Sequence, residues 1–140
     1  MVPPNPTVLS KFMTPRRFND AEYRQRIAGE IYGGRARGQS DVIKEFRRTS
    51  RTGYLLQQLA IAGWSSLPWL RFVRQPTLIM AGSDDPIIPL VNARMMARVI
   101  PDSRLRVFED GHLFLISAAS EAGPMVHEFL TAATVERGRS

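Results

Sequence analysis

The stretch PTLIMAGSDDPIIP, residues 76–89, decides the fold of this chain. Residues 77–81 are a short, continuous apolar run that ends at Gly82, the pattern of a strand buried on both faces of a parallel sheet. A helix is predicted to begin at Pro89, because the first turn of a helix tolerates proline, and Pro101 is expected to end it. Its apolar positions have the spacing of a face that packs on a sheet: Val91, Met95, Met96 and Val99.

Residues 104–108 predict a second strand, because apolar and charged side chains alternate along them. A last helix is predicted after Ser117 or Ser120. Four of its apolar residues are expected to face inward: Met125, Val126, Phe129 and Leu130. A strand, a helix, a strand and a helix make one right-handed βαβ crossover plus a helix, so the fold class is α/β. Two strands are too few for a stable open sheet, so more strands or a second chain are expected.

Carboxylates follow the first predicted strand directly, in the sequence Gly82-Ser83-Asp84-Asp85-Pro86. Open α/β sheets bind their ligands at the carboxyl ends of the strands, so Asp84 and Asp85 are candidate site residues. The alternative is a tight turn in which an aspartate caps the next helix. Taken alone, this motif does not decide between the two interpretations.

A histidine follows the second predicted strand, in the sequence Glu109-Asp110-Gly111-His112. Its unperturbed pKa suits proton transfer near neutral pH, although a single loop histidine is more often structural. Neighbouring parallel strands would bring Asp85 and His112 together. The carboxylate could then hold the imidazole in one tautomer, which leaves the other ring nitrogen free to deprotonate a serine. Acid before histidine, each after a strand, is also the order of the α/β-hydrolase triad.

The chain before residue 75 has a different character and predicts helices and turns. Pro3, Pro4 and Pro6 are expected to keep the first residues extended. Asp20 is the expected N-cap of a helix over residues 21–31, which the glycines at 33 and 34 end. Further helices are expected after Ser40 and over residues 54–62. An aromatic-rich segment with Trp64 and Trp69 follows, broken by Pro68.

Composition and charge narrow the classes of function. With 44% hydrophobic and 23% charged residues the chain is globular rather than disordered. Residues 1–74 carry 13 Lys/Arg against 5 Asp/Glu, and residues 75–140 carry 6 against 8. The arginines form scattered pairs without a nucleic-acid motif, so we predict a solvated basic face and no nucleic-acid partner. An acidic surface in another part of the same protein is the expected complement.

Several other kinds of site and segment are not expected. The absence of cysteine excludes disulfides and thiolate chemistry, and no histidine–carboxylate cluster has metal-ligand spacing, so no metal and no cofactor is predicted. His127 is expected to be a surface residue. No apolar run is long enough for a transmembrane segment, and MVPPNP does not resemble a signal peptide. We therefore expect the protein to be cytoplasmic, with the surface of storage granules as one candidate location.

The segment QPTLIMAGSDDPIIPLVNARMMARVIPDSRLRVFEDGHLFLI resembles the last third of an α/β-hydrolase. Within that superfamily it is most similar to intracellular medium-chain-length poly(3-hydroxyalkanoate) depolymerases. The resemblance extends upstream through MVPPNPTVL, MTPRRF and RIAGEIYGG. It implies that Asp85 is the triad acid, in preference to Asp84, and that His112 is the triad base. It implies a hydrophobic polyester or medium-chain ester as substrate.

The same resemblance divides the chain into three parts. Residues 1–7 would leave a core strand, residues 8–74 would form a helical lid, and residues 75–140 would be the C-terminal part of the core. The predicted fold is therefore a C-terminal fragment of an α/β-hydrolase, a helical lid followed by the last two parallel strands and their helices. Three aromatic residues of the lid are candidates for a substrate pocket, with lid packing as the alternative: Tyr54, Trp64 and Trp69.

The nucleophile is what the sequence lacks. The family needs a Gly-x-Ser-x-Gly turn between a strand and a helix, and no such pattern occurs in these 140 residues. One hypothesis is therefore that the chain is part of a serine ester hydrolase, inactive alone, whose N-terminal half or another chain supplies the serine. The other is a catalytically dead remnant or truncated reading frame with at most a binding or assembly role. A related carboxylic-ester hydrolase is the nearest enzyme alternative.

Overall fold

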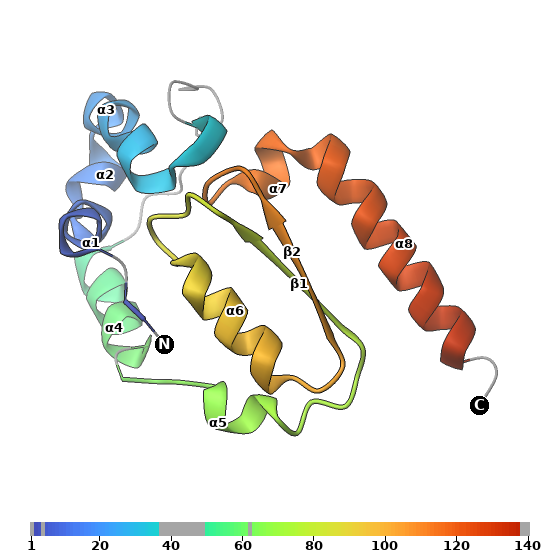
Figure 1. The fold of residues 1–140 in the computed structure, drawn as a ribbon. Helices are drawn as coiled ribbons and strands as arrows, with labels where there is room; N and C mark the ends of the chain where they lie inside the picture. The colour runs from blue at the N-terminus through green and yellow to red at the C-terminus, as the bar shows by residue number, and fades with distance from the viewer. Residues whose placement is uncertain (1, 4, 37–49, 62, 138–140) are drawn as a thin grey trace.

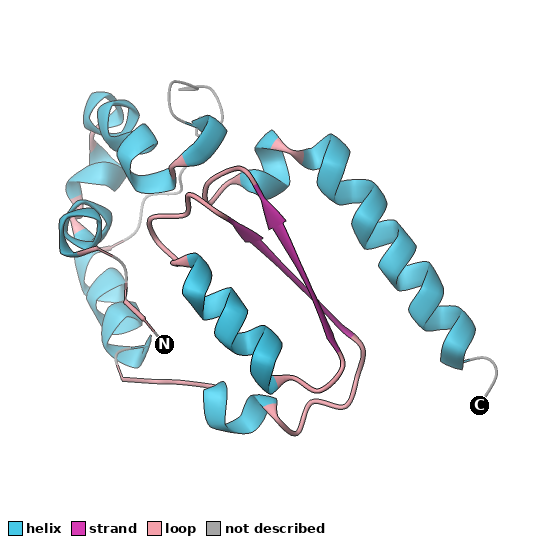
Figure 2. Ribbon diagram, viewed as in Figure 1, coloured by secondary structure: helices cyan, strands magenta, loops and turns pink. Residues whose placement is uncertain are grey.

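A computed structural model describes residues 2–3, 5–36, 50–61 and 63–137 of the chain (Figures 1 and 2). The elements are, in chain order, α1 (Pro6–Met13), α2 (Arg16–Asn19), α3 (Ala21–Tyr32), the 3₁₀ turn η1 (Gly34–Ala36), α4 (Arg51–Ile61), α5 (Leu67–Leu70), β1 (Thr77–Gly82), α6 (Leu90–Val99), β2 (Ser103–Phe108), α7 (Phe114–Ser117) and α8 (Ala119–Arg137). Helices α1 to α3 gather beside the carboxyl ends of the strands, α4 lies below α1 in this view, and α5 lies near the amino ends of the strands (Figure 1).

The predicted strand–helix–strand unit is confirmed. Strands β1 and β2 pair in parallel, from Thr77 opposite Ser103 to Gly82 opposite Phe108, and α6 connects them. Ile79 on β1 packs against Ala93 and Ile100 in one buried cluster. Helix α6 therefore covers one face of the sheet (Figure 1). The face that packs is not the predicted one: Leu90, Ala93, Met96 and Ala97 join this cluster, whereas Val91 is 41% exposed and only Met96 of the four predicted positions belongs to it.

The other face of the sheet carries a second, aromatic cluster. Phe108 at the end of β2 stacks on Phe114 of α7, with ring centroids 4.9 Å apart, and Ala118 and Ala122 complete the cluster. This packing fixes α7 and the first turns of α8 against the end of β2.

Further along α8 the predicted inward face is partly wrong. Met125 and Leu130 are 38% and 58% exposed, whereas Val126 and Phe129 are half-buried. A groove of about 410 Å³, lined by Arg106 and Met125 among others, separates β2 from this part of the helix. The charged side chains of Arg104 and Arg106 stand on the strand face turned toward α8, so the helix does not pack closely there.

The helix predicted over residues 21–31 is also confirmed and is one residue longer. The carboxylate of Asp20 accepts a hydrogen bond from Tyr23 N at 2.9 Å, as a helix N-cap should. Its buried side chains, Ile27, Ala28, Ile31 and Tyr32, pack against Ile87 and Leu113 from the two loops that follow the strands. Helix α3 thus rests on the carboxyl ends of β1 and β2.

The prolines of the first part behave differently from the prediction. Pro6 does not keep the chain extended but begins α1, because Asn5 caps the helix through a bond from Thr7 N and proline fits the first turn. Pro68 likewise stands in the first turn of α5 instead of breaking the segment. The helix expected after Ser40 lies outside the described residues, and the one expected over residues 54–62 is α4.

The first described residues attach to α6 through a buried amide. Asn92, 3% exposed, accepts a hydrogen bond from Val2 N at 2.6 Å and donates one to Val2 O at 2.8 Å. This pair of bonds fixes where the chain enters the fold. Across the described ranges of the chain, no helix combines the length and apolar character needed to span a bilayer.

Candidate active site

Asp85 and His112 lie side by side, each in the loop that follows a strand. The strand ends are paired, Gly82 opposite Phe108, so the two loops begin next to each other. His112 Nδ1 is 2.9 Å from Asp85 Oδ2, which confirms the proximity predicted from the order of strands and polar residues. The Asp85 side chain is 8% exposed and the His112 side chain 31%, so the carboxylate is shielded while the ring reaches solvent.

The Asp85 carboxylate also organises its own turn. Its Oδ1 accepts hydrogen bonds from Ile87 N and Ile88 N, both at 2.9 Å. One oxygen thus closes the predicted turn and the other faces the imidazole, but the expected helix cap is absent: Pro89 precedes α6, which has no side-chain cap. A carboxylate tied by two backbone bonds cannot rotate away from the ring without losing them.

Asp84 has a different place. Its Oδ2 accepts a hydrogen bond from Gly34 N at 2.9 Å, and the residue is exposed. Asp85, and not Asp84, is thus the carboxylate in contact with His112.

The C-terminal end of α3 holds His112 from the other side. His112 N donates to Tyr32 O at 2.7 Å, and the two rings stack with centroids 6.3 Å apart and 24° between their planes. With Nδ1 directed at Asp85, the geometry suits the tautomer that carries its proton on Nδ1. Within the part of the chain that the structure describes, Nε2 has no hydrogen-bond partner, so it is placed to accept a proton.

Sequence reasoning missed Asp110 as a site residue. Its side chain is 1% exposed and accepts hydrogen bonds from Gly111 N at 2.7 Å, Arg35 N at 2.8 Å and Ser117 Oγ at 2.6 Å. Burial acts to raise the pKa of Asp110, but these hydrogen bonds and the Arg35 charge outweigh it and hold the pKa below its usual value. The only sequence signal was the Asp-Gly pair before the histidine, which on its own predicts a turn.

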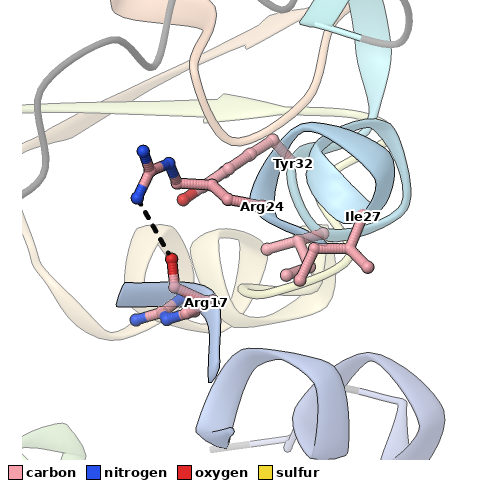
Figure 3. Close-up of a pocket in the computed structure, with 5 residues that line it drawn as sticks. Arg17, Arg24, Ile27 and Tyr32 are labelled. Atoms are coloured by element: carbon pink, nitrogen blue, oxygen red, sulfur yellow. Dashed lines mark hydrogen bonds between the residues drawn. The ribbon is translucent and has the colours of Figure 1, made fainter. Parts of the chain in front are cut away.

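A small cavity of about 10 Å³ lies on the inner side of α3 (Figure 3). It is lined by Arg17, Arg24, Ile27, Ile31 and Tyr32. Arg24 donates to Arg17 O at 3.3 Å, which joins α2 to α3 beside the Tyr32 ring. Burial raises the pKa of the Tyr32 hydroxyl, against the opposing effect of the two arginines. The cavity is too small for a substrate.

Two of the three candidate pocket residues, Trp64 and Trp69, are largely exposed. Trp64 and Trp69 are 68% and 71% exposed, and Trp69 lies on α5, which Figure 1 places near the opposite ends of the strands. Its recorded ring contact is with Phe72, at 6.4 Å between centroids. Tyr54 falls on α4, and its side chain lies outside what the structure describes. Their role in a substrate pocket stays a prediction.

The predictions for His127 and for a metal site remain to be compared with the structure. His127 is exposed on α8, where the sequence places it. Among the described residues, no three side chains of the metal-binding types gather at one point. The site thus consists of the Asp85–His112 contact with the buried carboxylate of Asp110 in the adjoining loop.

Relatives of known name match most of this chain. It is 42% identical over 134 residues to a poly(3-hydroxyalkanoate) depolymerase of Ectopseudomonas oleovorans, a match of 93% of this chain and 47% of that protein. It is 32% identical over 82 residues to a pimeloyl-[acyl-carrier protein] methyl ester esterase of Aromatoleum aromaticum, 58% of this chain and 32% of that one. The chain thus spans about half or less of the length of the curated relatives it matches.

Solved structures agree on the fold. The enol-lactonase of Burkholderia xenovorans LB400 superposes with a TM-score of 0.60 at 23% identity, covering 89% of this chain and 45% of the lactonase. The sequence model described as "alpha/beta hydrolase fold" matches residues 12–119, which include both strands and both site loops. Strand order, site position and sequence therefore lead to one conclusion: this chain belongs to the α/β-hydrolase family.

Proposed function

We propose that this chain is the C-terminal portion of a serine ester hydrolase that cleaves a polyester of 3-hydroxy acids. The observation that carries the proposal is the 2.9 Å contact between Asp85 Oδ2 and His112 Nδ1 at the carboxyl ends of two parallel strands. In this arrangement Asp85 holds the imidazole in one orientation and stabilises the imidazolium, and His112 Nε2 takes the proton of a serine. These two residues are the acid and base of the proposed triad.

The serine is proposed to lie outside these 140 residues, in an N-terminal half or on another chain. The printed sequence contains no Gly-x-Ser-x-Gly turn, and the relatives it matches are about twice as long. The oxyanion hole needs a backbone N–H next to that serine and so would come from the same part. No metal or cofactor takes part in the proposed reaction. Residues 8–74 would be the lid and residues 75–140 the core part, with residues 1–7 leaving a core strand.

The substrate class rests on the relative of 42% identity, a poly(3-hydroxyalkanoate) depolymerase. A hydrophobic polyester or a medium-chain ester fits that relationship, and Tyr54, Trp64 and Trp69 are the aromatic residues proposed to contact it. Such a polymer is stored in granules, so we place the protein in the cytoplasm at granule surfaces. The methyl ester esterase match favours a second candidate, a hydrolase of another carboxylic ester.

Complementation tests the proposal directly. The N-terminal half of the Ectopseudomonas oleovorans depolymerase, ending where the match to this chain begins, would be co-expressed with this chain. Hydrolysis of a poly(3-hydroxyalkanoate) suspension and of medium-chain p-nitrophenyl esters would then be measured. We expect activity that requires both parts and is lost in His112→Ala.

The outcomes separate the candidates. Activity on p-nitrophenyl esters but not on the polymer would favour another carboxylic-ester hydrolase. A complex that forms but hydrolyses neither substrate would favour the catalytically dead remnant. Activity that survives His112→Ala would overturn the assignment of the base.

A further inference from the structure

We propose that Asp110 is a positioning residue that holds the loops of Asp85 and His112 in register and locks both to the C-terminal turn of α3. The inference rests on the proposed function, because it assigns a task to Asp110 in that same acid–base pair. Asp110 does not touch His112's ring and is not a catalytic residue. It acts through the backbone on either side of the pair.

The first step is the side chain, which collects three donors from three segments. Its Oδ1 accepts from Gly111 N and from Arg35 N, at 2.7 Å and 2.8 Å, and its Oδ2 accepts from Ser117 Oγ at 2.6 Å. These donors belong to the histidine loop, to η1 and to α7. One buried carboxylate therefore joins its own loop and the nearby helix α7 to η1, which lies 75 residues away in sequence.

The second step is the backbone of the same residue, which reaches the acid. Asp110 O accepts a hydrogen bond from Asp84 N at 3.0 Å, one residue before Asp85. Gly111 is the single residue between Asp110 and His112, and His112 N is itself bonded to Tyr32 O at 2.7 Å. Asp110 thus sits between the acid and the base and is bonded to the loops of both.

The third step is how closely these backbones approach. A Cβ added to Gly34 would stand 1.9 Å from Gly111 N and 2.2 Å from Asp110 Oδ1, and one added to Gly111 would stand 2.0 Å from Tyr32 O. Segments this close leave no room to shift while keeping contact. Removing the Asp110 carboxylate should therefore separate the α3 turn from the histidine loop, because the two backbones cannot shift to another packed arrangement.

The charge on Asp110 also has a partner. Arg35 Nε lies 3.8 Å from Asp110 Oδ2, and Arg35 Nη1 is 2.8 Å from Glu121 Oε1 on α8. The guanidinium thus links the carboxylate to Glu121 on α8. An asparagine would keep an oxygen for Gly111 N and Arg35 N and an amide for the Ser117 hydroxyl, but would lose this charge.

The test uses the full chain with histidine labelled by ¹⁵N, in the variants Asp110→Ala, Asp110→Asn and Ser117→Ala. Glu109→Gln is the matched control, a neighbouring carboxylate that is exposed. The ¹⁵N shifts report whether Nδ1 of the His112 ring carries the proton, and exposed His127 is an internal reference. Hydrogen exchange of a peptide over residues 109–117 is measured in parallel.

We expect Asp110→Ala to move the His112 ring from the Nδ1–H form to a mixture of tautomers and to speed exchange of the 109–117 peptide at least about tenfold. Asp110→Asn should restore most of the ring signature, and Glu109→Gln should change neither readout. A folded Asp110→Ala variant with the wild-type ring spectrum would overturn the inference. If Asp110→Ala does not fold, Ser117→Ala decides, and an unchanged ring there would overturn it.

Asp85→Asn separates this inference from the proposed function. If Asp85→Asn changes the His112 ring and Asp110→Ala does not, the acid–base pair stands and the positioning role fails. If Asp85→Asn leaves the ring unchanged, the pair itself fails, whatever Asp110 does.

Discussion

Asp84 and Asp85 are adjacent in sequence and differ completely in contact. Asp85 faces the imidazole of His112, and Asp84 accepts a bond from Gly34 N. In the complemented enzyme, Asp85→Asn should lower kcat by orders of magnitude, about 10⁴-fold in the serine-protease case, because an amide favours the wrong tautomer. Asp84→Asn keeps an acceptor for Gly34 N and should cost far less. Rates on a medium-chain p-nitrophenyl ester would show this, and a reversed order would contradict the assignment.

Gly34 offers a test of the contact between α3 and the histidine loop. Its φ is +53°, and an added Cβ would clash with Gly111 N, so Gly34→Ala should destabilise the chain by well over about 1 kcal/mol. Gly123→Ala is the matched control, because nothing lies within 4 Å of an added Cβ there and alanine is worth up to about 1 kcal/mol more than glycine in a helix. Urea unfolding of both variants measures the difference. Equal midpoints would contradict the close approach.

The lowered pKa of Asp110 should make the free energy of unfolding depend on pH in the acid range. Because its folded-state pKa lies below the ordinary value of 3.8, the folded state favours the carboxylate. Its contribution is therefore fully present above about pH 4 and is lost as the pH falls through the lowered folded pKa. Asp110→Asn should remove that part of the acid sensitivity. The check is the urea midpoint of both proteins between pH 2.5 and 7, and identical slopes below pH 4 would contradict it.

At the scale of elements, β1 has one free edge within the described residues. It pairs with β2 alone, although residues 77–81 have the apolar pattern of a strand with neighbours on both sides. Such an edge invites pairing with another chain, so the isolated chain should associate at micromolar concentration. Light scattering over a dilution series would detect this, and a monomer throughout would contradict it.

A proline can identify the edge responsible. Thr77 N and Ser83 N both donate toward the β2 side, so by the alternation of a strand Leu78 N faces the free edge. Leu78→Pro should reduce association while keeping the bonds to β2. Ile79→Pro is the control, because its N–H faces β2 and its loss should lower the melting temperature instead.

The elements also show what sequence can and cannot predict. The run at 77–81 and the alternation at 104–108 predicted both strands, and the capping side chain of Asp20 predicted α3, because these signals are local. Helix α1 was missed because proline and Asn5 serve a helix start as well as an extended segment. The exposed part of α8 was missed because its partner surface carries Arg104 and Arg106, which the helix sequence does not reveal.

The site divides in the same way. Asp85 and His112 could be paired from sequence because parallel strands bring consecutive carboxyl ends together. Asp110 could not be assigned, because the donor that ties it to the rest of the fold, Arg35 N, is 75 residues away in sequence and only the packed fold brings it there. The role of Tyr32 was hidden for the same reason, since its backbone carbonyl, and not its type, binds His112 N.

At the scale of the whole molecule, the chain carries Asp85 and His112, the proposed acid and base. The printed sequence has no Gly-x-Ser-x-Gly turn to supply the serine. The isolated chain should therefore show no esterase activity, because both the nucleophile and the oxyanion donors are proposed to lie elsewhere. Purified chain would be assayed with medium-chain p-nitrophenyl esters against buffer. Turnover that His112→Ala abolishes would contradict this expectation.

The contact between the α3 turn and the histidine loop is made by main-chain atoms. Tyr32 O meets His112 N, and Gly34 stands against the backbone of Gly111. When two side chains are in contact, both can be substituted together, because a larger residue at one position is compensated by a smaller residue at the other. Main-chain atoms are the same in every residue, so no substitution of the partner can make room, and glycine has no side chain to shorten. In a library that randomises residues 33, 34 and 111 together, no compensating pairs should therefore emerge, and folded survivors should keep glycine at 34 and 111.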